Sequence, residues 1–275
     1  MSTLTGFVSI DNKGNATVAL LSDSRLTFIE RGKKDTNFDY SPKLFYLKSS
    51  PSIFGYCGDS IFVLGVLTQI CTALDISKTF IESSSINKKT DVVLDALNES
   101  AKYYPGLSQN TTQIVQIINI GKKFFMCEYE YNGQKRKFNK MISNINIAKG
   151  ADSVCIGSWG SGRTFYKKIN SYMRDKNGKY SRVYFRSMVL LLKHEVDKMT
   201  GGAPQMVVLS SDGLAKPVGI QYKKQMYLLG LPHIFEKTLD IVEFRNEAYE
   251  FVNENGTMKS RSQKHGYKDW IPTPS

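Results

Sequence analysis

The sequence predicts an α+β fold with mostly antiparallel sheets. Stretches typical of strands and of helices are grouped along the chain: strands, two helices, strands, two helices and strands again. Strands and helices that alternate one by one favour a parallel, doubly wound sheet, whereas grouped elements favour antiparallel layers. No repeat at the period of a solenoid is present, and 275 residues suffice for one large domain or two small ones.

The chain opens with a predicted β-hairpin. Two apolar runs rich in β-forming residues, 7–10 and 17–21, flank the turn-forming segment 11–15, DNKGN. The return run leads into an acid and a base, Asp23 and Arg25, which the alternation of side chains along a strand would place on one face. Alone, such a pair is typical of a surface ion pair worth about 0.2–1 kcal/mol.

The later elements follow from the same signals. Asp59 is a good helix N-cap, and apolar residues recur behind it at helical spacing. Asn132-Gly133 is a strong hairpin turn, and Gly201-Gly202 stop a long helix. The expected strands are 26–29, 44–47, 52–57, 113–120, 123–131, 141–147, 154–156, 205–209, 216–221 and 224–229, and the expected helices are 60–74, 89–103, 163–174, 182–199 and 240–251. We assign residues 1–230 to one domain and residues 231–275 to a C-terminal extension with one short helix and a basic polar tail.

The composition indicates an ordinary soluble globular protein, with 41% apolar and 23% charged residues. No window approaches the roughly 20 apolar residues of a membrane helix, and the start lacks a secretory signal, so we expect a cytoplasmic protein without a membrane partner. The net charge of +12 raises the question of nucleic-acid binding. The densest basic segments, 135–140 and 259–268, are not interleaved with aromatic residues, which favours solvated loops over a nucleic-acid partner.

The cysteines and histidines show no arrangement that suits a metal or a cofactor. The four cysteines lie singly in apolar runs, without a CxxC pair or a Cys/His cluster. We therefore expect free buried thiols in a reducing compartment. The three histidines are scattered along the chain. The sequence predicts no metal site and no cofactor.

Further polar residues stand at the ends of predicted elements. Lys43 begins a strand directly after a loop, and Gly157-Ser158 directly follow another strand. Asp197 and Thr200 lie three residues apart in the predicted long helix, so they share one side of it. The helix dipole disfavours an acid at a helix C-terminus by about 0.3–1 kcal/mol, so this acid invites a functional reason.

Together and in this order, these motifs resemble the proteasome β-subunit family of the N-terminal-nucleophile hydrolases. The resemblance extends over about residues 5–225. Its motifs are the opening strand TGFVSI, SDSR, Lys43 before LFYL, YCGD before a helix, IGS after a strand and DKMTGG before a strand. It implies a four-layer αββα sandwich, in which two antiparallel sheets lie between two pairs of helices.

The resemblance also implies chemistry at the first residue of the mature chain. The hydroxyl of that residue is the nucleophile, and its own α-amino group is the base. The amine must be free, because an amide nitrogen cannot take the proton. Carried over to this chain, the nucleophile is Thr5, after removal of a short leader.

The resemblance assigns roles to the other motif residues. Lys43 would favour ionisation of the hydroxyl through its positive charge, and Asp23 would keep Lys43 charged and oriented. The backbone N–H of Gly58 would donate to the oxyanion. Ser158, Asp197 and Thr200 would hold the terminal amine. Arg25 would give structural support, and Tyr56 would line a shortened specificity pocket.

Departures from the family pattern leave alternatives open. Leu4 precedes Thr5, where self-processing members typically have glycine. Removal of the first residue alone would expose Ser2, and serine can also be an N-terminal nucleophile, although the residues that follow Thr5 fit the pattern better. The loop before the expected lysine is longer than usual, and the alternative lysines are Lys33 and Lys34.

The leading hypothesis is a proteasome-like threonine hydrolase that cleaves peptide bonds in peptides or proteins. The alternative is a catalytically silent subunit that builds a ring or scaffold, and a third hypothesis is a basic binding module on the same fold. Members of the family usually assemble into rings, often with an unfolding ATPase. The resemblance therefore implies a homo-oligomeric ring with an ATPase partner.

Overall fold

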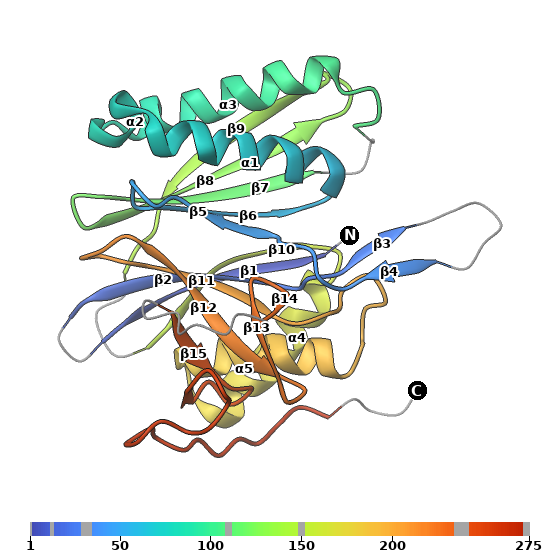
Figure 1. Cartoon of the computed structure of the whole chain (residues 1–275), viewed down its shortest axis with the longest axis vertical. Helices are drawn as coiled ribbons and strands as arrows, with labels where there is room; N and C mark the ends of the chain where they lie inside the picture. Colours follow the sequence, from blue (N-terminus) through green and yellow to red (C-terminus); the bar gives the residue numbers. More distant parts are fainter. Residues whose placement is uncertain are drawn as a thin grey trace.

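The fold is described by a computed structural model over residues 2–11, 14–28, 35–107, 112–147, 152–233 and 242–271. Within these residues the chain forms two large sheets, one two-stranded sheet and five helices (Figure 1). Neighbouring strands are antiparallel in all but one pairing. The predicted α+β class with mostly antiparallel sheets is therefore confirmed.

The larger sheet has nine strands in the described residues and is centred on the opening hairpin. The hairpin strands β1 and β2 pair from Leu4–Ser22 to Ile10–Ala16, around the predicted turn. β10 flanks β1 and β11 flanks β2, while β15 makes the parallel pairing, with β12. The strands are β1 (Thr3–Ile10), β2 (Ala16–Ser22), β10 (Val154–Gly160), β11 (Gln205–Ser210), β12 (Ala215–Tyr222), β13 (Gln225–Leu228), β14 (Leu231–Pro232), β15 (Glu243–Arg245) and β16 (Phe251–Val252).

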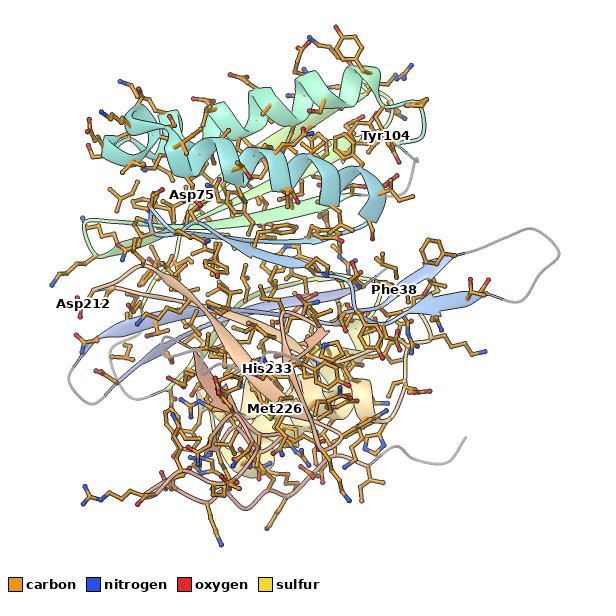
Figure 2. All side chains as sticks on the ribbon, viewed as in Figure 1. Phe38, Asp75, Tyr104, Asp212, Met226 and His233 are labelled. Atoms are coloured by element: carbon orange, nitrogen blue, oxygen red, sulfur yellow. The ribbon has the colours of Figure 1, made fainter. Side chains whose placement is uncertain are left out.

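The second sheet has five strands in the order β5-β6-β7-β8-β9. Asn132-Gly133 lies where β8 turns into β9, as the sequence predicts. A separate strand pair, β3 (Leu26–Phe28) and β4 (Thr36–Phe38), projects from the body and carries the half-exposed Phe38 (Figures 1 and 2). The five strands are β5 (Leu44–Tyr46), β6 (Ser52–Cys57), β7 (Gln113–Ile120), β8 (Lys123–Asn132) and β9 (Lys137–Asn144).

Helices cover the outer faces of the two large sheets (Figure 1). The predicted N-cap is confirmed, because the Asp59 carboxylate accepts a hydrogen bond from the Phe62 N–H at 3.0 Å. Apolar side chains form one core under each helical layer and a third core between the sheets, and Figure 2 shows them filling these spaces. The helices are α1 (Ser60–Ile76), α2 (Lys78–Glu82) and α3 (Ile86–Tyr103) on the five-stranded sheet, and α4 (Arg163–Asn177) and α5 (Ser181–Lys193) on the larger sheet.

Two predicted helices need correction. α5 ends at Lys193, six residues early, and residues 197–200 form a turn closed by Asp197, which accepts the Thr200 N–H at its carbonyl (3.0 Å). The helix predicted over 240–251 is wrong in its described part, which holds the strands β15 and β16, while residues 240 and 241 lie outside the described residues. α2 and β4 have no counterpart among the predicted elements.

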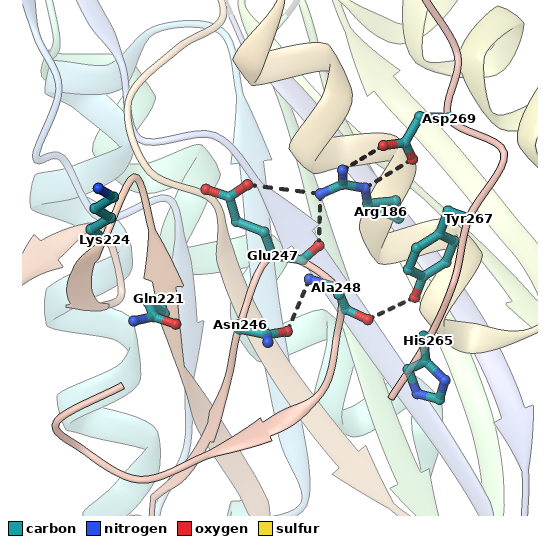
Figure 3. Close-up of a pocket in the computed structure, with 9 residues that line it drawn as sticks. All are labelled: Arg186, Gln221, Lys224, Asn246, Glu247, Ala248, His265, Tyr267 and Asp269. Atoms are coloured by element: carbon teal, nitrogen blue, oxygen red, sulfur yellow. Dashed lines mark hydrogen bonds and ion pairs between the residues drawn. The ribbon is translucent and has the colours of Figure 1, made fainter. Parts of the chain in front are cut away.

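The C-terminal extension packs against α5. Arg186 on α5 donates to both carboxylate oxygens of Asp269, at 3.1 and 2.6 Å, and to the carbonyl of Glu247 at 3.1 Å (Figure 3). Tyr267 and Trp270 pack against the core beneath α4 and α5. A polar pocket of about 410 Å³ lies between the extension and the larger sheet. The described part of the extension is thus held by ion pairs and by apolar contacts.

Candidate active site

Lys43 and Asp23 form a buried ion pair at the junction of the two large sheets. Asp23 directly follows β2, and Lys43 directly precedes β5. The Nζ of Lys43 lies 2.9 Å from Oδ2 of Asp23, and neither side chain is exposed to solvent. Burial lowers the pKa of Lys43, while the charge of Asp23 and its hydrogen bond oppose that shift. The carboxylate of Asp23 therefore stabilises the buried ammonium of Lys43.

The carboxylate of Asp23 is fixed by backbone donors as well as by Lys43. Its Oδ1 accepts the N–H of Thr3 at 3.0 Å. Its Oδ2 accepts the N–H groups of Arg25 and Gly201, both at 3.2 Å. These donors come from the first strand, from the turn after β2 and from the turn before β11. The carboxylate thus ties three segments together with Oδ2 turned toward Lys43.

Ser2 is the residue that Lys43 reaches. The Lys43 Nζ donates to the Ser2 Oγ at 2.6 Å, and Ser2 is only 1% exposed. Because the ammonium uses a lone pair of the oxygen, the Ser2 hydroxyl keeps its own proton. Thr3 pairs with Gly160 in the antiparallel register of β1 and β10, which puts Ser2 opposite Ser161. A Cβ on Gly160 would lie 1.9 Å from the Ser2 carbonyl oxygen, so this approach requires glycine.

A second hydrogen-bonded group lies beside the start of β1. The hydroxyls of Thr200 and Ser161 donate to Oδ2 of Asp197, at 2.7 and 3.1 Å. Since this uses the proton of Thr200, the hydroxyl of Thr3 is the donor in its 3.0 Å contact with the Thr200 Oγ1. A Cβ on Gly162 would lie 1.9 Å from the Thr3 Oγ1 and 2.9 Å from the Thr200 Oγ1. The absence of a side chain at Gly162 lets this group close.

Thr5 and Ser158 lie together, but not at Lys43. The Thr5 hydroxyl donates to the carbonyl of Gly157 at 2.9 Å and lies 3.0 Å from the Ser158 Oγ. In the described part of the chain, neither hydroxyl makes a hydrogen bond to Lys43 or to Asp197. Thr5 is three residues beyond Ser2, and Ser158 is three residues before Ser161, its counterpart on the antiparallel partner strand. The two predicted residues therefore meet each other in the interior of the sheet.

Gly58 directly follows β6 and has a φ of +117°, a conformation that favours glycine. Its neighbour Cys57 lies close to the carbonyl of Ser2, because a Cβ on Gly160 would meet both groups, at 3.3 and 1.9 Å. The end of β6 thus adjoins the first residues of β1. Burial raises the pKa of the Cys57 thiol to about 12, which argues against this thiol as a competing nucleophile.

Arg25 and Tyr56 occupy different surroundings from those expected. Arg25 does not pair with Asp23 but makes a bidentate ion pair with Asp39, at 2.7 and 2.8 Å. A hydrogen bond from Arg25 to the carbonyl of Lys198, at 3.3 Å, links this pair to the turn that holds Asp197. Tyr56 is fully buried in the core beneath α1 and does not line an accessible surface.

Ser161 and Thr3 are the site residues that the sequence reasoning missed. A signal for Ser161 was present, because Gly-Ser occurs twice, at Gly157-Ser158 and at Gly160-Ser161. The two serines differ in their partners, since Ser158 pairs with Thr5 and Ser161 lies opposite Ser2, the residue that Lys43 contacts. The alternative lysines, Lys33 and Lys34, lie outside the described residues.

The described residues contain no group of three or more His, Cys, Asp or Glu side chains that could hold a metal ion. No helix in the described ranges is long and apolar enough to cross a membrane. The four cysteines are free thiols, and three of them are buried.

Comparison with known proteins identifies the fold. No protein-family model matches this sequence, and no curated protein matches it. Among solved structures, Anbu (ancestral beta-subunit) from Yersinia bercovieri matches with 11% identity and a TM-score of 0.50, over 78% of this chain and 86% of that chain. Anbu from Hyphomicrobium sp. strain MC1 and its (Gly-1) mutant match with 12% identity and TM-scores of 0.46 and 0.43, at the same coverage. At such identity, the likeness to the Yersinia protein shows a shared fold alone.

These comparisons correct the family assignment that the motifs suggested. The proteasome β-subunit family is not supported, because no family model matches and the structure that shares the fold is described as an Anbu protein. The motifs are short and are separated by loops of unusual length, so they do not specify one family within a shared fold. What the comparisons establish is a fold in common with a protein described as an ancestral beta-subunit.

Proposed function

We propose that this protein is an N-terminal-nucleophile hydrolase that uses Ser2, in place of Thr5, to cleave amide bonds. The observation that carries the proposal is the 2.6 Å contact between the Ser2 Oγ and the Lys43 Nζ, backed by the buried Lys43–Asp23 ion pair. A lysine that both touches a hydroxyl and is held by a carboxylate is suited to stabilise a developing alkoxide.

The proposed reaction begins once the Met1–Ser2 peptide bond has been cleaved and the amine of Ser2 is free. The amine takes the proton of the Ser2 hydroxyl, and the oxygen attacks the carbonyl carbon of the substrate amide. The backbone N–H of Gly58 would donate to the oxyanion. The resulting ammonium returns a proton to the leaving amine, which gives an ester on Ser2. A water molecule, activated by the same amine, then hydrolyses the ester.

The hydrogen-bonded group of Ser161, Asp197 and Thr200 supports a role in holding the terminal amine. The strand register puts Ser161 opposite Ser2. The Asp197 carboxylate accepts hydrogen bonds from the hydroxyls of Ser161 and Thr200. We propose Ser161 for the role that the motif resemblance gave to Ser158.

Covalent labelling of the protein tests this proposal. The sample is protein whose mass and N-terminal sequence show Ser2 as the first residue. It is treated with a β-lactone, a strained ester that acylates activated hydroxyls, so the natural substrate need not be known. We expect one adduct, mapped to Ser2 by peptide sequencing, and none on protein that retains Met1.

Matched variants separate the two candidate nucleophiles. Ser2→Ala should lose the adduct, whereas Thr5→Val should keep it within about threefold, because the Thr5 hydroxyl bonds to Gly157 and lies beside Ser158, and in the described part of the chain it makes no hydrogen bond to Lys43. An adduct on Thr5, or labelling of Ser2→Ala at the wild-type rate, would contradict the proposal.

A catalytically silent ring or scaffold subunit is the second candidate. It is favoured by Leu4, which stands where self-processing members of the resembled family typically have glycine, because a residue whose nitrogen stays in a peptide bond has no amine to act as a base. Absence of labelling on chains that begin at Ser2, together with a folded and oligomeric protein by light scattering, would favour this candidate.

Finer features of the prediction are also proposals. The helices outside two stacked sheets and the three apolar cores support the four-layer αββα arrangement. Free thiols support a cytoplasmic location. Peptide or protein substrates fit amide cleavage, and the homo-oligomeric ring and its ATPase partner stay predictions.

A further inference from the structure

Gln205, the first residue of β11, bridges the two backbone segments that carry the Lys43–Asp23 pair. Its Oε1 accepts the backbone N–H of Lys43 at 3.1 Å. Its Nε2 donates to the carbonyl of Asp23 at 3.0 Å and to the carbonyl of Ser41 at 2.7 Å. One side chain therefore joins the end of β2, in the larger sheet, to the start of β5, in the five-stranded sheet.

The amide of Gln205 is fully committed to these contacts. The side chain is not exposed to solvent, so water cannot replace a missing partner. Both donor hydrogens and the acceptor oxygen are used, and the amide cannot flip, because a flip would turn its oxygen toward two carbonyls. Gly230 leaves the space that the amide needs, since a Cβ there would lie 3.0 Å from Nε2.

The geometry points to Gln205 as a positioning residue for the active site, an inference that rests on the proposed function. The side chains of Asp23 and Lys43 come from different sheets, and no covalent element fixes the distance between their backbones. Gln205 sets that distance together with the hydrogen bond from the Ser41 N–H to the Ser24 carbonyl at 3.0 Å, and with it the 2.9 Å ion pair and the approach of Lys43 to Ser2. Displacements of about 1 Å at a catalytic group can reduce rates by up to two orders of magnitude.

The test compares Gln205→Met with Gln116→Met. Gln116 is the matched control, because it is also a buried glutamine that bridges two groups: it donates to the Ser52 Oγ at 3.1 Å and accepts the Tyr129 hydroxyl at 2.6 Å, within the five-stranded sheet. Both changes remove one buried amide, so a loss of stability alone should affect them alike. Gln205→Asn, which is one methylene shorter, serves if Gln205→Met does not fold.

Two readouts are measured on each variant with Ser2 as the first residue. The first is the rate of β-lactone labelling of Ser2 against pH. For Gln205→Met we expect the rate to fall at least about tenfold and its alkaline limb to move to lower pH, because a looser ion pair stabilises the Lys43 ammonium less. The second is the ¹⁵N titration of the Lys43 ammonium by NMR, assigned by its loss in Lys43→Met. Its midpoint should move in the same direction, while Gln116→Met leaves both readouts at wild-type values.

The two readouts also separate failure of this inference from failure of the proposed function. If the wild type labels at Ser2 but Gln205→Met matches Gln116→Met in rate, pH profile and titration, the positioning role is wrong. If the wild type does not label, the proposed function fails, and the NMR titration alone decides whether Gln205 holds the ion pair.

Discussion

The ammonium of Lys43 donates to the hydroxyl of Ser2 at 2.6 Å and to the carboxylate of Asp23 at 2.9 Å. Ser2 directly precedes β1, Asp23 directly follows β2 and Lys43 directly precedes β5. Because the pair is wholly buried, removal of one partner leaves the other group unpaired inside the protein.

Variants of this pair should separate stability from activity. We expect Lys43→Met to lower the free energy of unfolding by about 3–5 kcal/mol, because a buried carboxylate loses its partner. The double variant Asp23→Asn/Lys43→Met should recover much of that loss but should remain unlabelled at Ser2. Denaturant unfolding and β-lactone labelling measure the two effects, with the exposed Lys122→Met as control. Full labelling of the double variant would contradict the role of Lys43 in activating the Ser2 hydroxyl.

The stability of the protein should depend on pH through Lys43. Burial lowers the folded-state pKa of Lys43 below its ordinary value of 10.5. At pH values between the folded-state pKa and 10.5, the unfolded state therefore binds more protons than the folded state. The cost of burying the charge is full below the folded-state pKa and is relieved as the pH rises toward 10.5. The free energy of unfolding of the wild type minus that of Asp23→Asn/Lys43→Met should therefore rise with pH through this window. A flat or falling difference would contradict the direction of the shift.

Gly162 should tolerate no side chain. In Gly162→Ala, the Cβ would lie 1.9 Å from the Thr3 Oγ1 and 2.9 Å from the Thr200 Oγ1, so the group around Asp197 has to move. We expect labelling of Ser2 to fall at least about tenfold, since the terminal amine loses its anchor. Gly65→Ala is the control: it lies in α1 with no atom within 4 Å of its Cβ, and it should gain about 0.5–1 kcal/mol of stability. Wild-type labelling of Gly162→Ala would show that the packing there is not critical.

Arg186 should hold the C-terminal extension in place. Its side chain is 11% exposed, and its guanidinium pairs with Asp269 and Glu247. Arg186→Met leaves Asp269 without this cation, while Glu247 keeps its ion pair with Lys193 at 3.9 Å, so we expect the extension to loosen near Asp269 and Trp270 to become exposed. A red shift of tryptophan emission and faster proteolysis after residue 245 would report this. Trp159 is buried elsewhere and supplies the constant background. An unchanged spectrum and proteolysis rate would mean that strand pairing and apolar contacts fasten the extension without Arg186.

The fold class was readable from the sequence because it depends on local patterns. The opening hairpin, the Asp59 cap and the Asn132-Gly133 turn are each specified by neighbouring residues, and the structure contains all three. The helix predicted over 240–251 was wrong because the apolar spacing there is also compatible with strands. Pairing of β15 with β12 stabilises the strand conformation instead.

The candidate site was readable only in part because it depends on register. Asp23, Lys43, Asp197 and Thr200 flank turns, and their positions follow from the elements beside them. The choice between Thr5 and Ser2, and between Ser158 and Ser161, is one question, because paired strands shift together. Hydroxyls recur at the same three-residue interval on both segments, so one register pairs Thr5 with Ser158 and puts Ser2 opposite Ser161, and only the contacts of Lys43 show which pair lies at the site.

The placement of Ser2 directly before β1 has a practical consequence for producing the protein. An affinity tag fused ahead of Met1 would keep the nitrogen of Ser2 in a peptide bond, and a tagged sample would then give a negative result in any activity screen whatever its true competence. A tag after residue 275 leaves the first strand untouched, and the ion pair of Asp269 with Arg186 fastens the preceding residues to α5.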